Sequence, residues 1–412
     1  MLIRFIIVGL FFFSSFVSGV EKTKKNPPEE ALEVARDSAA FALDLYNQMP
    51  QNENICFSPY SISSAFAMVY TGAKGDTQKE ISTVLHFPQS AEKMNVGWAW
   101  LNKFLTFYPS NASEDIRLRI ANSLWIQTNF PILPAFRDQM SKYFNGTFRF
   151  VDFKNYAETA RATINAWVKQ NTFGKIADIL PTPLDSSTRM VLVSALYLKA
   201  RWKNQFDEHV TSQQPFFLMD GSIETTLSMG QSAFFPYLDT PEVSILEMPY
   251  INSRKEGPEF SMLVILPHQR YGISDVEKDL RAEKLDQWVK NLQNTRVIVT
   301  IPKFKILQSA NLNDVLSKQG MELPFSDQAD FSGISGVKGL KIGNVLHKVY
   351  LSVDETGSEA AAATAIGMNT TAVLEQKTSV IFQADHPFIY IIVEKTTGTI
   401  LFIGRIAEPN KM

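Results

Sequence analysis

The spacing of hydrophobic and polar residues changes several times along the chain, and these changes predict its helices and strands. Apolar residues recur at helical spacing through residues 29–49, which predicts an amphipathic helix that ends at Pro50. Ser58-Pro59 is a typical helix start, and the helix is predicted to run to about residue 71. Thr77 is placed to cap the next helix. The remaining helices are predicted at residues 78–85, 95–107, 159–172, 275–293 and 310–319.

Strands are predicted mainly in the second half of the chain. Residues 190–197 form an almost continuous apolar run, which indicates a strand buried on both faces. Because helices come early, strands cluster late and the two interleave irregularly, the pattern indicates an α+β fold. The chain contains no linker rich in Gly, Ser or Pro and no internal repeat that would divide it into domains. Further strands are predicted at residues 54–57, 116–125, 225–229, 243–248, 261–266, 297–301, 345–353, 379–382, 389–394 and 400–405.

Residues 354–374, between two predicted strands, have an unusual composition. They contain four consecutive alanines, no aromatic residue and no proline, and no charge lies between Glu359 and Glu375. A connection this long in a compact domain is usually functional or disordered. Three structures fit it. Alanine favours a helix, the segment is long enough for a flexible linker, and the small, uncharged residues at every second position from Ser358 suit a strand that can enter a sheet.

The composition is that of an ordinary soluble globular protein. The chain has 412 residues, a net charge of −2 and 45% hydrophobic residues. It has no basic stripe that would indicate nucleic acid or another polyanion as a partner.

The first residues are different from the rest. Arg4 precedes an apolar run at residues 5–13, and small residues follow as far as Gly19. These are the parts of a secretory signal, so we expect a signal peptide at residues 1–19 and one domain at residues 20–412. An uncleaved membrane anchor is the alternative. The signal predicts a secreted, extracellular protein, or a periplasmic one in a bacterium.

Cys56 is the single cysteine, so no disulfide can form within the chain, and its apolar neighbours indicate a buried thiol. Three asparagines match the acceptor pattern for N-glycosylation: Asn111, Asn145 and Asn369.

No local motif for catalysis, a metal or a cofactor is present. The sequence lacks the Gly-x-Ser-x-Gly elbow, the His-Glu-x-x-His helix, paired cysteines and the glycine-rich loops that bind phosphates. Its five histidines are scattered, with no ligand spacing among them. We therefore expect no metal, no cofactor and no enzyme activity, and a hydrolase with a triad assembled from distant residues is the remaining enzyme hypothesis.

The chain resembles the serpin family from about residue 30 to its end. Each segment that carries the resemblance is weak alone, but their order and spacing together are highly specific. They lie at residues 54–62, 72–77, 194–202, 247–250, 262–267, 301–304, 331–333, 346–348, 384–388 and 401–405.

The resemblance implies a monomeric single domain with three β-sheets, about eight or nine helices and an exposed reactive-centre loop at about residues 355–378. It also implies an irreversible, suicide-substrate inhibitor of serine proteases. In such proteins a protease cleaves the loop and is trapped as an acyl-enzyme, because the cleaved loop inserts into the large sheet as a new strand. Non-inhibitory serpins (carriers, chaperones or storage proteins) and inhibitors of papain-like cysteine proteases are the alternatives.

Counting along the loop at the family's usual spacing places the reactive bond between Thr371 and Ala372, with Thr370, Ala372 and Val373 competing with Thr371 as the residue before the bond. An uncharged, β-branched Thr371 suits elastase-like or subtilisin-like proteases. Met368 or Leu374 would suit chymotrypsin-like enzymes instead. The resemblance assigns the hinge to Glu355, Gly357, Ser358, Glu359, Ala360, Ala361, Ala362 and Ala363.

The resemblance also assigns Trp202 to the breach, where the sheet begins to open. It assigns Ser58, Ser61, Ser194 and His347 to the shutter, a buried cluster that controls opening. The family usually has an asparagine in place of Ser194. Because serine reaches less far, we expect His347 to bond to Ser58, Ser61 or a water instead. No basic helix resembles a heparin site, and no stable membrane association is expected.

Overall fold

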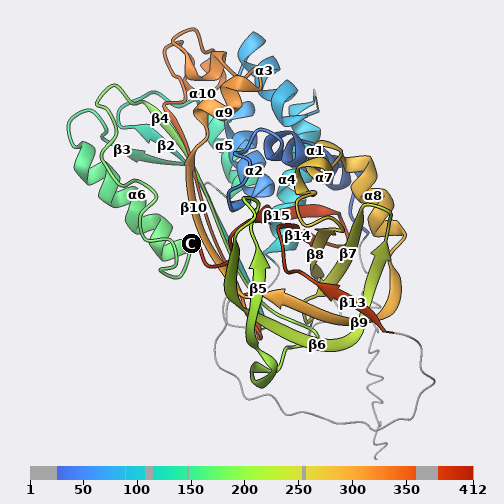
Figure 1. The fold of residues 1–412 in the computed structure, drawn as a ribbon. Coiled ribbons are helices and arrows are strands. Elements are labelled where there is room, and N and C mark those ends of the chain that lie inside the picture. Colours follow the sequence, from blue (N-terminus) through green and yellow to red (C-terminus); the bar gives the residue numbers. More distant parts are fainter. Residues whose placement is uncertain are drawn as a thin grey trace, which may run out of the picture.

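The computed structural model describes residues 26–88, 90–106, 115–145, 148–252, 257–358 and 379–411 (Figure 1). Within them the fold is α+β, as predicted. None of these helices is long and apolar enough to cross a bilayer. The α-helices are α1 (Glu29–Tyr46), α2 (Pro59–Tyr70), α3 (Gly75–Leu85), α4 (Ala91–Leu105), α5 (Pro134–Phe144), α6 (Ala157–Asn171), α7 (Ile273–Lys278), α8 (Ala282–Lys290), α9 (Asn313–Lys318) and α10 (Ser332–Ser335).

A six-stranded sheet forms the centre of the fold. Its order is β10 (Phe304–Asn311), β11 (Asn344–Val353), β12 (Gly357–Ser358), β4 (Met190–Arg201), β2 (Ile116–Gln127) and β3 (Phe148–Val151). The central strands β4 and β11 run parallel to each other. β4 is buried over nearly its whole length, as its apolar run predicts, because α6 covers one face of the sheet and α2 packs against the other (Figure 1).

The other nine strands are hydrogen-bonded into a second layer. They are β1 (Ile55–Phe57), β15 (Thr399–Ile406), β14 (Phe388–Glu394), β8 (Phe260–Pro267), β7 (Val243–Pro249), β6 (Ile223–Asp239), β9 (Gln293–Pro302), β13 (Val380–Gln383) and β5 (Ser212–Phe217). The long strand β6 joins β7 through only three residue pairs, whereas it follows β9 for ten. The layer therefore consists of two sheets that share β6, which with the central sheet gives the predicted three.

The main hydrophobic core lies between the helices and the buried strands β14, β15 and β8. A second, smaller core lies beneath α6, where Ile164 and Val168 belong to the same buried cluster as residues of β2, β4 and β11. The core beneath α6 thus spans the line along which the two central strands meet.

Some elements differ from the sequence predictions. Residues 275–293 do not form one helix, because the chain turns between α7 and α8 and β9 begins at Gln293. The helix predicted at residues 310–319 covers only α9, and the residues before it belong to β10. Thr77 lies inside α3, where its Oγ1 accepts a hydrogen bond from the Asp330 N–H at 2.9 Å, and so does not cap the helix. The patterns missed α5, α10, β3, β5 and β10.

Candidate functional site

The line between β4 and β11, which we call the seam, is closed along most of its length and open at one end. The two strands pair directly from Val191–Asn344 to Tyr197–Tyr350. Beyond that point they separate, and the two residues of β12 lie between them. Ser358 is paired both with Val353 of β11 and with Ala200 of β4. The first hinge residues have thus begun a new antiparallel strand inside the sheet.

Close packing explains why a glycine is needed at the entry to the seam. A Cβ atom on Gly357 would lie 2.0 Å from the carbonyl oxygen of Ala200, which no side chain can tolerate without a backbone shift. The next side chain, Ser358, is fully buried, and its Oγ lies 2.6 Å from the hydroxyl of Tyr250. The small, hydrogen-bonded serine fits the principle that a buried polar group needs a partner.

The turn before β12 is held by Trp202, the predicted breach residue. Its indole Nε1 donates to the Asp354 carbonyl at 2.9 Å, and its backbone N–H donates to the Thr356 carbonyl at 2.9 Å. The indole ring stacks on Tyr250 with centroids 4.4 Å apart and an interplanar angle of 10°. Trp202 therefore holds the turn through the backbone of residues 354–356, while its stacking partner binds Ser358.

Glu355 fixes the same turn by charge. Its buried carboxylate pairs with the Lys303 ammonium at 2.7 Å and accepts a hydrogen bond from Thr211 Oγ1 at 2.7 Å. Burial alone would raise the pKa of Glu355, but the hydrogen bonds from Lys303 and Thr211 outweigh it, and the pKa lies below its usual value. Glu355 is therefore ionised at neutral pH and anchors the hinge to β9 and β10 through the intervening lysine.

The four predicted shutter residues lie together near the middle of the seam. Ser194 of β4 and His347 of β11 are direct neighbours across it. Ser58 and Ser61 come from the first turn of α2, where the Ser58 hydroxyl caps the helix by accepting the Ser61 N–H at 3.1 Å. All four side chains are buried.

Their hydrogen bonds run in one direction. His347 Nε2 accepts the Ser58 N–H at 3.0 Å, so in the neutral ring Nδ1 carries the proton and donates to Ser194 Oγ at 3.0 Å. Ser194 Oγ then donates to Ser61 Oγ at 2.8 Å. Ser61 in turn donates to Asn122 Oδ1 at 2.6 Å. Burial lowers the pKa of His347 to about 3, so the imidazole is neutral at physiological pH.

Asn122 is the cluster residue that the sequence analysis missed. It lies on β2, directly opposite Ser194, and its amide nitrogen donates to the Ser61 carbonyl at 3.0 Å. His347 does bond to Ser58, as expected, but it bonds to Ser194 as well, so the expectation that Ser194 would not reach it is wrong. Asn122 on the adjacent strand supplies the amide that the family usually has at position 194. Ser61 and Ser194 link this amide to the imidazole of His347.

The other predicted site residues lie largely outside the described residues. Glu359, Ala360, Ala361, Ala362 and Ala363 of the hinge do so, as do the reactive bond Thr371–Ala372 and the acceptors Asn111 and Asn369. Asn145 is described: it is exposed at the end of α5, with a left-handed φ of 55°.

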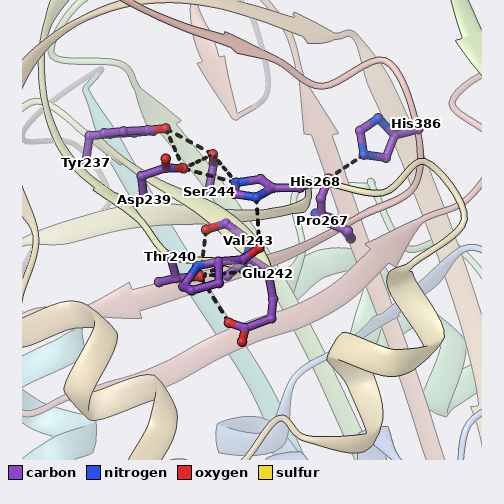
Figure 2. Close-up of polar contacts among 10 residues, drawn as sticks. Tyr237, Asp239, Thr240, Glu242, Val243, Ser244, Pro267, His268 and His386 are labelled. Atoms are coloured by element: carbon purple, nitrogen blue, oxygen red, sulfur yellow. Dashed lines mark hydrogen bonds and ion pairs between the residues drawn. The ribbon is translucent and has the colours of Figure 1, made fainter.

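A serine, a histidine and an aspartate do meet at one end of β7, but not as a catalytic triad (Figure 2). His268 Nδ1 faces the Pro241 carbonyl at 3.2 Å, and Nε2 lies 3.0 Å from Asp239 Oδ1 and 3.2 Å from Ser244 Oγ. In a triad the acid and the serine bind opposite nitrogens of the imidazole. Here both share Nε2, so Asp239 cannot orient His268 as a base toward Ser244. The described residues contain no group of three or more side chains suited to a metal ion.

A model of the family described as serpin (serine protease inhibitor) matches residues 36–409. The chain belongs to the serpin family. Serpins are protease inhibitors and not enzymes, which agrees with the shared nitrogen of His268 and sets the hydrolase hypothesis aside.

Curated serpins align with most of the chain. Leukocyte elastase inhibitor A of Rattus norvegicus is 37% identical, with 90% of this chain and 98% of the relative covered. Leukocyte elastase inhibitor of Homo sapiens is also 37% identical, and the alignment covers 90% of this chain and 97% of the relative. The uncharacterized serpin-like protein TK1782 of Thermococcus kodakarensis is 38% identical, at 90% and 84% coverage.

Solved serpin structures share the fold. The thermophilic serpin tengpin in its native state has a TM-score of 0.82 at 27% identity, with 94% of this chain and 96% of that chain covered. Human thyroxine-binding globulin, solved with its hormone, has a TM-score of 0.82 at 30% identity, with 93% and 100% covered. The neighbours thus include a serpin whose name describes a carrier.

Proposed function

We propose that this chain is an irreversible inhibitor of an elastase-like or subtilisin-like serine protease, and that it works by inserting its cleaved loop into the seam. The observation that carries the proposal is the pairing of Ser358 with both β4 and β11. A strand that has already begun inside a sheet needs only more loop residues to lengthen. The relatives named leukocyte elastase inhibitors favour the same class of target.

The chemistry of trapping needs no catalytic group from this chain. The protease serine attacks the carbonyl of Thr371, the bond to Ala372 breaks, and the new amine leaves with residues 372–412 while Thr371 stays esterified to the protease. Insertion then competes with hydrolysis of that ester. From Ser358 to Thr371 a strand spans roughly 45 Å at about 3.3 Å per residue. That is slightly more than the 12 residues of β4 and so enough to fill the seam.

Every second residue from Ser358 would enter the core side of the sheet, as Ser358 does. Ala360 and Ala362 are small and uncharged, which suits that position. Ala361 and Ala363 would face the opposite side. This alternation supplies a matched pair of variants for testing insertion.

The direct test is incubation with pancreatic elastase, followed by denaturing electrophoresis and mass spectrometry of the released fragment. We expect a covalent complex that survives SDS and a C-terminal fragment that begins at Ala372. Ala362→Arg should give clean cleavage without a complex, because a buried unpaired charge opposes insertion, whereas Glu359→Arg, which would lie beside the half-buried Lys199 on the other face, should still trap the protease. Cleavage of the unmodified chain without any complex would refute the proposal and favour a non-inhibitory serpin. If elastase leaves the loop intact, a subtilisin and then a papain-like enzyme are tested in the same assay.

We also propose that the protein is exported after removal of residues 1–19, because their charge and apolar pattern is that of a secretory signal. The mature protein should begin at Val20. N-terminal sequencing of the secreted form tests this, and a chain retained in the membrane with Met1 intact would contradict it.

A further inference from the structure

A cavity lies beside the large sheet, away from the seam. Its volume is about 600 Å³, within the range of small-molecule sites. One wall is the edge of β2 at residues 118–120, which pairs with β4 on its other side, whereas β3 pairs with β2 only from Leu124 onward. The opposite wall is the C-terminal end of α6 and the residues that follow it. The cavity therefore lies between the C-terminal end of α6 and residues 118–120 of β2.

Two arginines make this cavity positive. Arg119 of β2 and Arg149 of β3 both line it, and no aspartate or glutamate is among its described lining residues. Within the described part of the chain, each guanidinium lies over an aromatic ring instead of an acid. Arg119 is 4.9 Å from the centroid of Phe173, and Arg149 is 5.6 Å from that of Trp167. Stacking leaves the N–H groups at the guanidinium edges available to an anion.

The aromatic residues in the walls of the cavity set a second requirement for the ligand. Phe173 is 46% exposed and holds a left-handed φ of 51°, which is uncommon for a bulky residue. Gln170 and Asn171 place carboxamide groups on the same wall. Flat apolar faces next to unneutralised cations suit a ligand that is itself flat and anionic.

We propose that this cavity binds a small anion carrying a flat ring, such as an aryl carboxylate or aryl sulfate. The anionic group is held by Arg119 and Arg149, and the ring stacks beside Trp167 and Phe173. Sequence reasoning could not find this site, because the two arginines lie on separate strands 30 positions apart and form no basic run.

The position of the cavity connects the ligand to loop insertion. α6 packs across the seam, since Ile164 and Val168 share one core with β4 and β11. A strand inserted there moves β4 and β11 apart by about 4.8 Å, so α6 must shift relative to one of them. A ligand between α6 and the β2–β3 edge ties α6 to the β4 side and so slows insertion. This coupling rests on the proposed inhibitory function, whereas binding itself does not.

The binding test uses intact, uncleaved protein and naphthalene-2-sulfonate as the probe, measured by isothermal titration calorimetry. Naphthalene-2-sulfonamide, which has the ring without the charge, is the matched ligand control. We expect the sulfonate to bind and the sulfonamide to bind far more weakly. Arg119→Gln and Arg149→Gln should each weaken binding about tenfold, the usual effect of a lost charge-assisted hydrogen bond. Arg296→Gln, an exposed position on β9, should leave it unchanged.

Three results would overturn the site: no binding of the sulfonate, equal binding of the sulfonamide, or unchanged affinity in both arginine variants. Arg149 is exposed, so its variant should fold even if replacing Arg119 disturbs the sheet, and thermal unfolding of each variant checks this.

In the elastase assay, saturating sulfonate should raise the number of serpin molecules consumed per protease inactivated. If the probe binds and that number stays the same, the coupling is wrong and the site stands. If the chain traps no protease at all, the proposed function fails and the calorimetry still decides the site.

Discussion

At the scale of single residues, the hydrogen bonds of the shutter require His347 to be neutral. Its Nε2 must accept a hydrogen bond from Ser58 while Nδ1 donates to Ser194, which only the neutral ring can do. Burial lowers its pKa from the ordinary 6.5 to about 3. A protonated ring would lose the bond to Ser58 and place an unpaired charge between the two central strands.

This arrangement predicts a specific loss of stability in acid. Below pH 6.5 the unfolded chain binds a proton that the folded protein does not accept until about pH 3. The contribution of His347 is therefore complete above pH 6.5 and falls toward pH 3, by up to about 1.4 kcal/mol per pH unit. Urea unfolding of the uncleaved protein at about pH 7.5 and about pH 5 measures the loss. His347→Gln, which does not titrate, should show a smaller drop, and an equal drop in both proteins would count against the shutter role.

At the scale of elements, the hinge depends on a two-residue strand, β12, that fits only because position 357 has no side chain. A Cβ there would collide with the carbonyl oxygen of Ala200 at 2.0 Å. The strand would then be displaced from β4, and the pairing of Ser358 from which insertion starts would be lost.

We therefore expect Gly357→Val to turn the inhibitor into a substrate. Loss of one or two hydrogen bonds, at about 1 kcal/mol each, should slow insertion about tenfold. The number of serpin molecules consumed per protease inactivated would rise accordingly, and titration of elastase activity measures it. Thr356→Val serves as the control, since the only hydrogen bonds of Thr356 in the described part of the chain come from its backbone. An unchanged ratio in Gly357→Val would show that β12 does not start insertion.

Sequence reasoning found those elements whose local signals are strong. Ser58-Pro59 marks the start of α2, and the apolar run at residues 190–197 marks a strand buried on both faces, and both are present. It failed for the single helix predicted at residues 275–293, because a six-residue helix such as α7 owes its stability to packing more than to its own pattern. Asn122 was overlooked although a polar residue in an apolar strand needs partners. Both hydrogen bonds of its side chain are with Ser61 of α2, which only the fold brings to it.

At the scale of the whole molecule, the described fold is a sheet that can accept one more strand. β4 and β11 are parallel neighbours, and an antiparallel strand between them, as β12 begins, would pair with both along their lengths. The sheet therefore has fewer hydrogen bonds between its strands before a strand is inserted than it can have afterwards. Under the proposed function, the shutter residues and α6, which lie on opposite faces of the sheet, would hold the seam closed.

Thermal unfolding before and after loop cleavage tests this account most directly. Insertion adds about a dozen hydrogen bonds worth about 1 kcal/mol each, so the cleaved protein should unfold at least about 10 °C above the intact one. The loop is cut with a protease added in trace amounts, and both forms are heated under the same conditions. A cleaved protein that unfolds at the same temperature as the intact protein, or below it, would contradict the claim that the seam takes up the loop.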